Sequence, residues 1–323
     1  MDIVGLDSLV FGVDDIGACA TFLTDFGLTA TAEAGVFEAL DGTAIRLHRR
    51  DDPALPPALP SGSMLRETVY AVSSAAVLED IRAEISRDRV VSEGADGSIG
   101  FTDDAGFALR FRTDRRRPVT LPGERVNIPG QPPLRGVNEL GVSPEADLTP
   151  RTLSHVVYFV PDFARAEAFY AERLGFRTVD RFTDVGPFMR PAGTTEHHTL
   201  FLIQTPPQMT GIEHFSFHMA GPTGLMQAGA RLSARGYQTF WGPGRHNMGS
   251  NWFWYFNCPM GCHAEYDADM DQHDDQWVPR EMPPGPESSQ SFLMQLRQKW
   301  APMGPRPAPR GEAGATAPAG AVA

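Results

Sequence analysis

Residues 244–266, GRHNMGSNWFWYFNCPMGCHAEY, include three side chains of types that catalyse reactions or bind metals: His246, Tyr255 and Glu265. The Pro-Met-Gly sequence at 259–261 predicts the turn of a β-hairpin. Tyr255 and Glu265 are equally far from that turn, so we expect them to face each other on paired strands. A carboxylate among aromatic residues is costly to bury unless it is paired or binds a metal. The segment therefore predicts a cation site that needs further ligands.

Histidines that could supply those ligands are concentrated in the second half of the chain. Of the nine histidines only His48 lies in the first half. His155 begins an expected strand, HVVYFV, and His214 begins another, HFSFHM. Two imidazoles and one carboxylate on neighbouring strands form the facial triad of non-heme Fe(II) oxygenases. An isolated histidine is more often a packing or surface residue, so spacing alone leaves the set His155, His214 and Glu265 open.

Two other clusters favour structural interpretations. Cys258, Cys262 and His263 lack the distant partner pair that a zinc cluster requires, so we interpret them as the end of the hairpin. His218 follows His214 by four positions on one strand, too far along for both to ligate one metal.

Composition narrows the class of protein. The chain has 323 residues, 41% hydrophobic and 21% charged, and is long enough for two domains. A formal net charge of −12 argues against nucleic acid or an anionic membrane as partner. Three cysteines predict no disulfide framework and fit a reducing cytoplasm. The opening residues predict neither a signal peptide nor a transmembrane helix.

The chain contains an internal repeat. An offset of 147 residues superimposes the segment 9–28 on the segment 156–176, and each predicts a strand, a helix started by Asp and a Gly-containing stop. One further strand–helix run in each half gives four similar units. Ser8 then stands where the second copy has His155. Structural demands should be shared by both copies, whereas a residue needed for chemistry is needed in one, so we expect no catalytic metal in the first half.

The predicted organisation has four parts. Residues 1–112 form a non-catalytic paired domain, 113–150 a Pro-, Gly- and Arg-rich linker, and 151–283 the metal-binding catalytic domain. Residues 284–323 form a Pro-, Ala- and Gly-rich tail that we expect to be largely disordered, because its final stretch, APMGPRPAPRGEAGATAPAGAVA, cannot bury apolar area. The disorder is expected in roughly the last twenty residues.

The second half resembles the type I extradiol ring-cleaving dioxygenases of the vicinal oxygen chelate superfamily. Their signature combines a Gly-x-His, an aliphatic residue before a tyrosine, a Pro-x-Gly turn and a glutamate. The matching residues here are Gly244, His246, Tyr255, Pro259, Gly261 and Glu265. Trp254 replaces the aliphatic residue and Cys258 replaces the family's Asp or Asn, which bears on subfamily rather than on mechanism. The motifs cover roughly 150–275, and 5–112 match as architecture alone.

The resemblance implies an α+β fold of four βαβββ modules paired into two vicinal-oxygen-chelate domains. It implies His155, His214 and Glu265 as ligands of Fe(II), with Mn(II) also suited to this set. His246 and Tyr255 would bond to the oxygens of the substrate and orient it.

The segment EHHTLFL (196–202) resembles the family segment that supplies a further catalytic histidine. His197 and His198 point to opposite faces of a strand, so one of them can face the metal. The distance from His214 favours His198 as the group that stabilises bound oxygen and transfers a proton, and leaves His197 on the solvent or packing side.

The implied function is extradiol cleavage of a catechol by Fe(II)-activated dioxygen, with both oxygen atoms incorporated, in aromatic catabolism. An apolar wall of Trp241, Trp252, Phe188 and Met248 would limit stray oxidation of the iron. Trp241 and Met248 close to His246, with the aromatic run around Tyr255, would favour a substituted or multi-ring catechol. Two alternatives remain: a 4-hydroxyphenylpyruvate dioxygenase-like enzyme, and a metal-free binding protein of the bleomycin-resistance kind. We expect a cytoplasmic homo-oligomer, whose subunit number, substrate and cleavage position the sequence leaves open.

Overall fold

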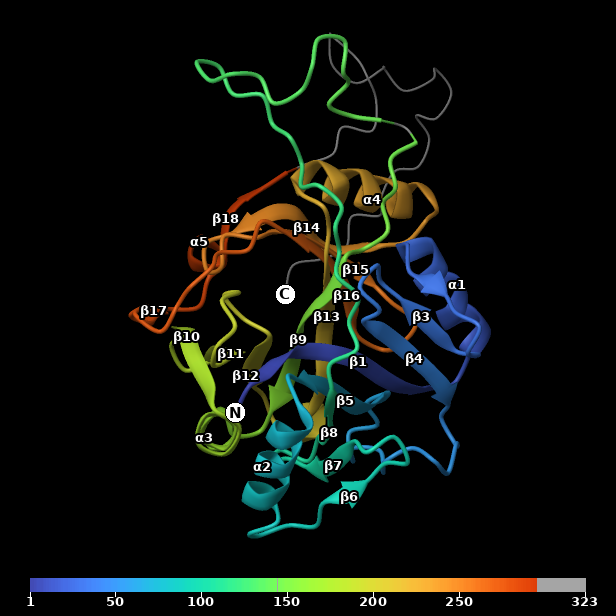
Figure 1. The fold of residues 1–323 in the computed structure, drawn as a ribbon, viewed down its shortest axis with the longest axis vertical. Coiled ribbons are helices and arrows are strands. Elements are labelled where there is room, and N and C mark those ends of the chain that lie inside the picture. The colour runs from blue at the N-terminus through green and yellow to red at the C-terminus, as the bar shows by residue number, and fades with distance from the viewer. Residues whose placement is uncertain (144, 295–323) are drawn as a thin grey trace, which may run out of the picture. The chain divides into compact units, whose positions relative to one another are not determined.

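The structure, a computed structural model, describes residues 1–143 and 145–294. Its described strands form two sheets, one from each half of the chain (Figure 1). We find no helix among these residues with the length and apolar character to span a membrane.

The first sheet has eight strands in the order β2-β3-β4-β1-β5-β8-β7-β6. Its strands and helices are β1 (Ile3–Val13), α1 (Ile16–Phe26), β2 (Thr29–Ala30), β3 (Val36–Glu38), β4 (Ala44–Arg49), β5 (Leu65–Val72), α2 (Ala75–Ile85), β6 (Ser92–Glu93), β7 (Ile99–Thr102) and β8 (Ala108–Thr113). The first strands of the two modules, β1 and β5, run antiparallel at the centre. Each pairs in parallel with the last strand of its own module, β1 with β4 and β5 with β8.

The second sheet has ten strands in the order β17-β10-β11-β12-β9-β13-β16-β15-β14-β18. Its strands and helices are β9 (Thr152–Val160), α3 (Phe163–Ala168), the π-helical turn η1 (Phe169–Arg173), β10 (Phe176–Phe182), β11 (Gly186–Pro191), β12 (Leu200–Gln204), the 3-10 turn η2 (Pro207–Met209), β13 (Gly211–His218), α4 (Pro222–Ala234), β14 (Thr239–His246), β15 (Trp252–Asn257), β16 (His263–Ala268), β17 (Arg280–Met282), α5 (Pro286–Ser289) and β18 (Gln290–Leu293). β9 and β13 repeat the central antiparallel pair, and β9 with β12 and β13 with β16 repeat the parallel pairs.

The predicted α+β fold of four βαβββ modules is confirmed. Ser8 pairs with Val69 across β1 and β5, and His155 pairs with Ser216 across β9 and β13. The offset of 147 residues therefore relates the two central strand pairs in space as well as in sequence.

The predicted Asp-started helices are confirmed in both copies. Asp15 accepts a hydrogen bond from the backbone N–H of Ala18 at 2.9 Å, and Asp162 accepts one from Arg165 at 3.0 Å. Such side chains satisfy N–H groups that have no partner within the helix. Gly27 ends α1 at a φ of 109°, a conformation that favours glycine.

The two halves share one apolar core. Tyr158 of β9 stacks on Phe107, and Tyr266 of β16 stacks on Phe26, each with ring centroids 4.0 Å apart. Tyr158 also hydrogen-bonds through its hydroxyl to Thr68 of the first half. The first half thus packs against one face of the strands whose other face carries the residues described below.

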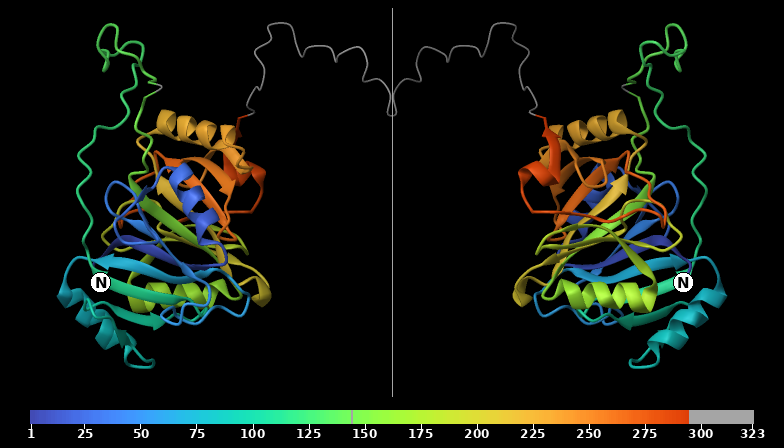
Figure 2. Two further views of the ribbon diagram at one scale, coloured as in Figure 1. Left: turned by 90° about the vertical axis from the view of Figure 1, so that its right-hand side faces the viewer. Right: turned by 90° about the vertical axis from the view of Figure 1, so that its left-hand side faces the viewer.

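Residues 114–151 form no helix or strand where the structure describes them, and run outside the two sheets (Figures 1 and 2). The tail expected from residue 284 differs from the prediction at its start, because α5 and β18 lie in it and β18 pairs with β14. Its short apolar run, SFL, gave too weak a strand signal beside the prolines. The expectation of disorder for residues 295–323 lies outside the described residues.

Candidate metal centre and pocket

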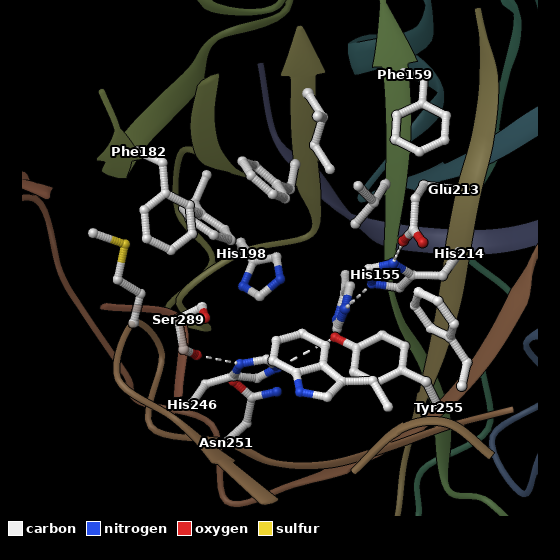
Figure 3. A pocket seen from close by; sticks show the side chains of 17 residues that line it. His155, Phe159, Phe182, His198, Glu213, His214, His246, Asn251, Tyr255 and Ser289 are labelled. Carbon is white, nitrogen blue, oxygen red and sulfur yellow. Dashed lines mark hydrogen bonds and ion pairs between the residues drawn. The ribbon is translucent and has the colours of Figure 1, made fainter. Parts of the chain in front are cut away.

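Three buried side chains converge from three adjacent strands of the second sheet: His155 on β9, His214 on β13 and Glu265 on β16. Figure 3 shows the two histidines. The Nε2 atoms of the two histidines are 3.2 Å apart. Glu265 Oε2 lies 2.9 Å from His155 Nε2 and 3.5 Å from His214 Nε2. One ligand atom from each residue lies within 4.8 Å of the others, so the set can hold one metal ion.

The chemistry of this donor set fits a divalent cation. Glu265 is completely buried, and neither of its carboxylate oxygens has a hydrogen-bond donor of suitable geometry. A buried carboxylate in that state is costly unless a cation compensates it. Burial alone would raise the pKa of Glu265, but His155 and its neighbours outweigh burial and lower it to about 2. The carboxylate is therefore ionised and ready to bind a metal.

When no metal is bound, His155 is protonated and forms an ion pair with Glu265. Burial alone would lower its pKa, but the carboxylates of Glu265 and Asp267 outweigh burial and raise the pKa to about 9. A metal that binds through His155 Nε2 must displace this proton.

His246 and Tyr255 lie beside the triad. Tyr255 pairs directly with Glu265 across β15 and β16, which confirms the expected pairing about the turn. His246 Nε2 lies 3.2 Å from the Tyr255 hydroxyl and 3.8 Å from Glu265 Oε1. His246 Nδ1 donates to the backbone carbonyl of Ser289 at 2.8 Å, which turns Nε2 toward the site (Figure 3).

His198 faces the pocket and His197 faces away from it. The ring of His198 lies 4.2 Å from that of His155, whereas His197 is fully buried with Nε2 2.9 Å from Asp180 Oδ2. The Nδ1 atoms of His197 and His198 are 3.0 Å apart. Because Asp180 can only accept, His197 carries its proton on Nε2 and accepts the Nδ1–H of His198. His198 Nε2 is then left with a free lone pair.

The positions of the first half that are equivalent to those of the triad carry different side chains. Register places Ser8 at the position of His155, Glu67 at that of His214, and Arg110 at that of Glu265. Arg110 Nε lies 3.0 and 2.9 Å from the two oxygens of Glu67. A guanidinium thus compensates the carboxylate, which gives a physical reason for expecting no catalytic metal in this half; that expectation stays a prediction.

The triad opens into a cavity of about 350 Å³, within the range of small-molecule sites. Its walls are mainly apolar: Val157, Phe159, Phe182, Phe188, Phe201, Ile203, Phe240, Trp241, Met248. The expected wall residues Trp241, Phe188 and Met248 line it. Trp252 does not, because strand alternation turns it away from Tyr255 onto Phe292, with ring centroids 5.3 Å apart.

Three residues that line the cavity, Glu213, Asn251 and Ser289, were not predicted from the sequence. Glu213 lines the cavity beside His214 because a β-bulge interrupts the alternation of β13 between Ile212 and His214, and sequence alternation would have placed it on the other face. Ser289 belongs to the expected tail. Asn251 also lines the cavity, and no motif in its loop predicts this from the sequence.

The cluster interpreted from the sequence as the end of the hairpin, Cys258, Cys262 and His263, lies outside the triad. Cys258 and Cys262 are free thiols with their sulfurs 3.5 Å apart, and His263 Nδ1 bonds to Glu213 at 2.7 Å. Among the described residues, the triad is the group of His, Cys, Asp or Glu side chains placed to hold a metal.

Comparison with known proteins agrees with this geometry. Residues 152–266 match the model of the Glyoxalase/Bleomycin resistance protein/Dioxygenase superfamily. Metapyrocatechase 2 of Cupriavidus necator is 38% identical over 122 residues, a match that spans only 38% of this chain and 38% of that enzyme. Biphenyl-2,3-diol 1,2-dioxygenase of Paraburkholderia xenovorans is 28% identical over 288 residues, which cover 86% of this chain and 92% of that enzyme.

Solved structures share the fold over most of the chain. The Mn(II)-bound glyoxalase from Novosphingobium aromaticivorans superposes with a TM-score of 0.70 at 21% identity, covering 90% of this chain and 91% of that one. The 2,3-dioxygenase LapB from Pseudomonas sp. KL28 superposes with a TM-score of 0.67 at 18% identity, covering 88% and 98%. The chain therefore has the two-domain vicinal-oxygen-chelate fold, and the match to the Glyoxalase/Bleomycin resistance protein/Dioxygenase superfamily model lies in its second half.

Proposed function

We propose that this protein is an extradiol dioxygenase, which uses Fe(II) and dioxygen to cleave a catechol-type ring beside its two hydroxyls. The observation that carries the proposal is the arrangement around the triad. His246 and Tyr255 lie beside it, the ring of His198 lies 4.2 Å from that of His155, and all of these side chains line a mainly apolar cavity. The nearly full-length relative named biphenyl-2,3-diol 1,2-dioxygenase supports the same chemistry.

His155, His214 and Glu265 would hold the Fe(II) and leave adjacent coordination positions open. Fe(II) bound there would act as a Lewis acid that favours ionisation of a catechol hydroxyl, and would also provide a centre at which dioxygen can react. Mn(II) suits the same ligands.

His246 and Tyr255 orient the diol. Burial, followed by the charge of Glu265, raises the pKa of Tyr255 well above its usual value, so its hydroxyl keeps its proton and donates to a substrate oxygen. The bond to Ser289 holds the His246 ring in place, so that Nε2 can contact the same group.

His198 serves as the proton-transfer residue. Burial, and then the positive potential of His155, lowers the pKa of His198 well below its usual value. The neutral ring carries a lone pair on Nε2, which can take a proton from the substrate and return it later in the reaction.

The cavity favours an uncharged, apolar substituent on the catechol. Among its described lining residues there is no Arg or Lys to pair with a carboxylate, and Phe182, Phe188 and Phe201 form an aromatic cluster next to His198. Burial of one extra ring against such residues contributes on the order of 1–3 kcal/mol. We therefore propose a substituted or two-ring catechol as substrate.

A panel of catechols tests this function. Anaerobically purified protein is loaded with Fe(II) and mixed with catechol, 2,3-dihydroxybiphenyl and a catechol carboxylate in air-saturated buffer. The proposal predicts a yellow ring-fission product, formed fastest from 2,3-dihydroxybiphenyl. Absence of product from every diol would overturn the activity, and a tenfold preference for unsubstituted catechol would overturn the substrate class alone.

We also propose a cytoplasmic homo-oligomer. The free thiols Cys19, Cys258 and Cys262 fit a reducing compartment.

A further inference from the structure

Each candidate ligand histidine is linked to a carboxylate through the ring nitrogen that faces away from the triad: His214 directly to the half-buried Glu213, and His155 through the Ser154 hydroxyl to the buried Asp267. His155 Nδ1 donates to Ser154 Oγ at 2.9 Å, and that hydroxyl donates to Asp267 Oδ2 at 2.8 Å. Asp267 Oδ2 itself lies 3.4 Å from His155 Nδ1. His214 Nδ1 donates to Glu213 Oε2 (Figure 3).

Each carboxylate also holds a second, outer histidine. Asp267 Oδ1 lies 2.5 Å from His218 Nδ1, and His218 Nε2 lies 3.1 Å from Glu196 Oε1 near the surface. Glu213 Oε1 accepts from His263 Nδ1 at 2.7 Å. Two chains of the same order, ligand histidine, carboxylate and outer histidine, therefore lead outward from the triad.

This arrangement fixes which nitrogen of each ligand ring is free. An ionised carboxylate only accepts, so His214, which bonds to Glu213, carries its hydrogen on Nδ1. Ser154 gives its own hydrogen to Asp267 and therefore accepts from His155 Nδ1, which must carry a hydrogen as well. The lone pair of Nε2 then points at the metal position, and the negative charge behind the ring makes that nitrogen a better donor to a metal.

The fold itself does not require these groups. In the first half, Arg66 stands at the position of Glu213, and the pair Ala71 and Arg112 stands at that of His218 and Asp267. The first half forms the same modules without either chain. The carboxylates therefore accompany the triad rather than the architecture.

We infer that Asp267 and Glu213 are positioning residues, which hold His155 and His214 in the metal-binding tautomer and orientation. The inference rests on the proposed function in one respect, namely that the triad binds a metal. The outer histidines His218 and His263 in turn hold the carboxylates in place.

The test is the affinity of the metal-free protein for Fe(II), measured anaerobically by competition with a chromophoric chelator. Asp267→Asn and Glu213→Gln keep the shape of each side chain but remove the charged acceptor. Each should weaken Fe(II) binding about 10- to 100-fold. His218→Gln and His263→Gln should weaken it less than the variant of the carboxylate that each supports.

Asp103→Asn is the matched control. Asp103 is a buried aspartate of the first half that accepts a hydrogen bond from the Tyr170 hydroxyl at 3.0 Å and does not belong to the triad or to either chain of groups behind it. It should lower the melting temperature of the metal-free protein and leave Fe(II) affinity unchanged. In the two test variants the affinity should fall even where the melting temperature matches that of the wild type, which a merely structural role would not produce.

The measured affinities distinguish a failure of the positioning roles from a failure of the proposed function. Wild-type affinity in both test variants would overturn the positioning roles and leave the proposed function intact. A loss in one variant alone would overturn the role of the other carboxylate. A wild-type protein that binds no Fe(II) would overturn the proposed function and this inference together.

Discussion

At the scale of single residues, charge compensation decides where a metal can bind. Glu265 is buried beside His155, whose proton a metal can displace, whereas its counterpart in the first half is Arg110, paired with Glu67. The same strand positions thus hold either a guanidinium that stays charged or a set of groups able to bind a metal.

Glu265→Gln should remove most of the bound iron, from about one ion per chain to roughly a tenth of that, because the anionic ligand is lost. Metal analysis after anaerobic Fe(II) loading measures this. Glu67→Gln removes a buried, ion-paired glutamate from the first half and serves as control, with iron content unchanged. Full iron occupancy in Glu265→Gln would remove Glu265 from the ligand set.

His198→Phe should retain iron and substrate binding while kcat falls about 10²- to 10⁴-fold, since the proton-transfer group is lost. Steady-state kinetics with a fixed oxygen concentration measures this. A His198→Phe enzyme with wild-type kcat, together with a His197→Asn enzyme that has lost it, would move the role to His197.

Metal affinity should rise with pH. The folded, metal-free protein holds a proton on His155 up to a pKa of about 9, and a metal binds only when that proton leaves. Binding should therefore tighten by up to about tenfold per pH unit below pH 9. Mn(II) titration followed by electron paramagnetic resonance at constant ionic strength measures this, and a flat profile from pH 6.5 to 8.5 would contradict the assignment of that proton.

At the scale of elements, the hairpin β15–β16 brings Tyr255 and Glu265 together, and α4 supports it from behind. Trp254, which departs from the family signature, packs on α4 at Gly229. A Cβ at that glycine would lie 2.1 Å from the Trp254 ring. The missing side chain of Gly229 thus accommodates the larger residue beside Tyr255.

Gly229→Ala should destabilise the protein by about 1–3 kcal/mol, because the methyl group overlaps the indole and the helix must shift. Gly224→Ala is the matched control on the same helix, since its Cβ would lie 3.8 Å from the nearest atom, an ordinary contact. That control should be neutral or stabilising by up to about 1 kcal/mol. Chemical denaturation compares the two, and equal stabilities would refute the packing explanation.

The elements also show what the sequence can and cannot predict. The repeat, the Asp caps and the hairpin register were all predictable, because each depends on local spacing. The bulge that turns Glu213 toward His214 was not, since strand alternation places neighbours on opposite faces. The pairing of β18 with β14, which brings Ser289 to His246, depends on a contact between segments separated by more than forty residues.

At the scale of the whole molecule, duplication separates support from chemistry. The first half packs Phe26 and Phe107 onto the rear face of the strands that carry the triad. Its own equivalent positions hold Ser8, Glu67 and Arg110. The predicted roles of His155, His214 and Glu265 came from matching a family motif, and the structure adds the physical reason that the other copy differs.

The proposed reaction places both atoms of one dioxygen molecule in the ring-opened product of a catechol-type substrate. The most direct measurement is mass spectrometry of the product formed from 2,3-dihydroxybiphenyl by the Fe(II)-loaded protein under isotopically labelled dioxygen. We predict a ring-opened product that carries two labelled oxygen atoms and is absent when Glu265→Gln replaces the wild type. Unreacted diol, or a product with one labelled atom beside oxygen from water, would contradict the account.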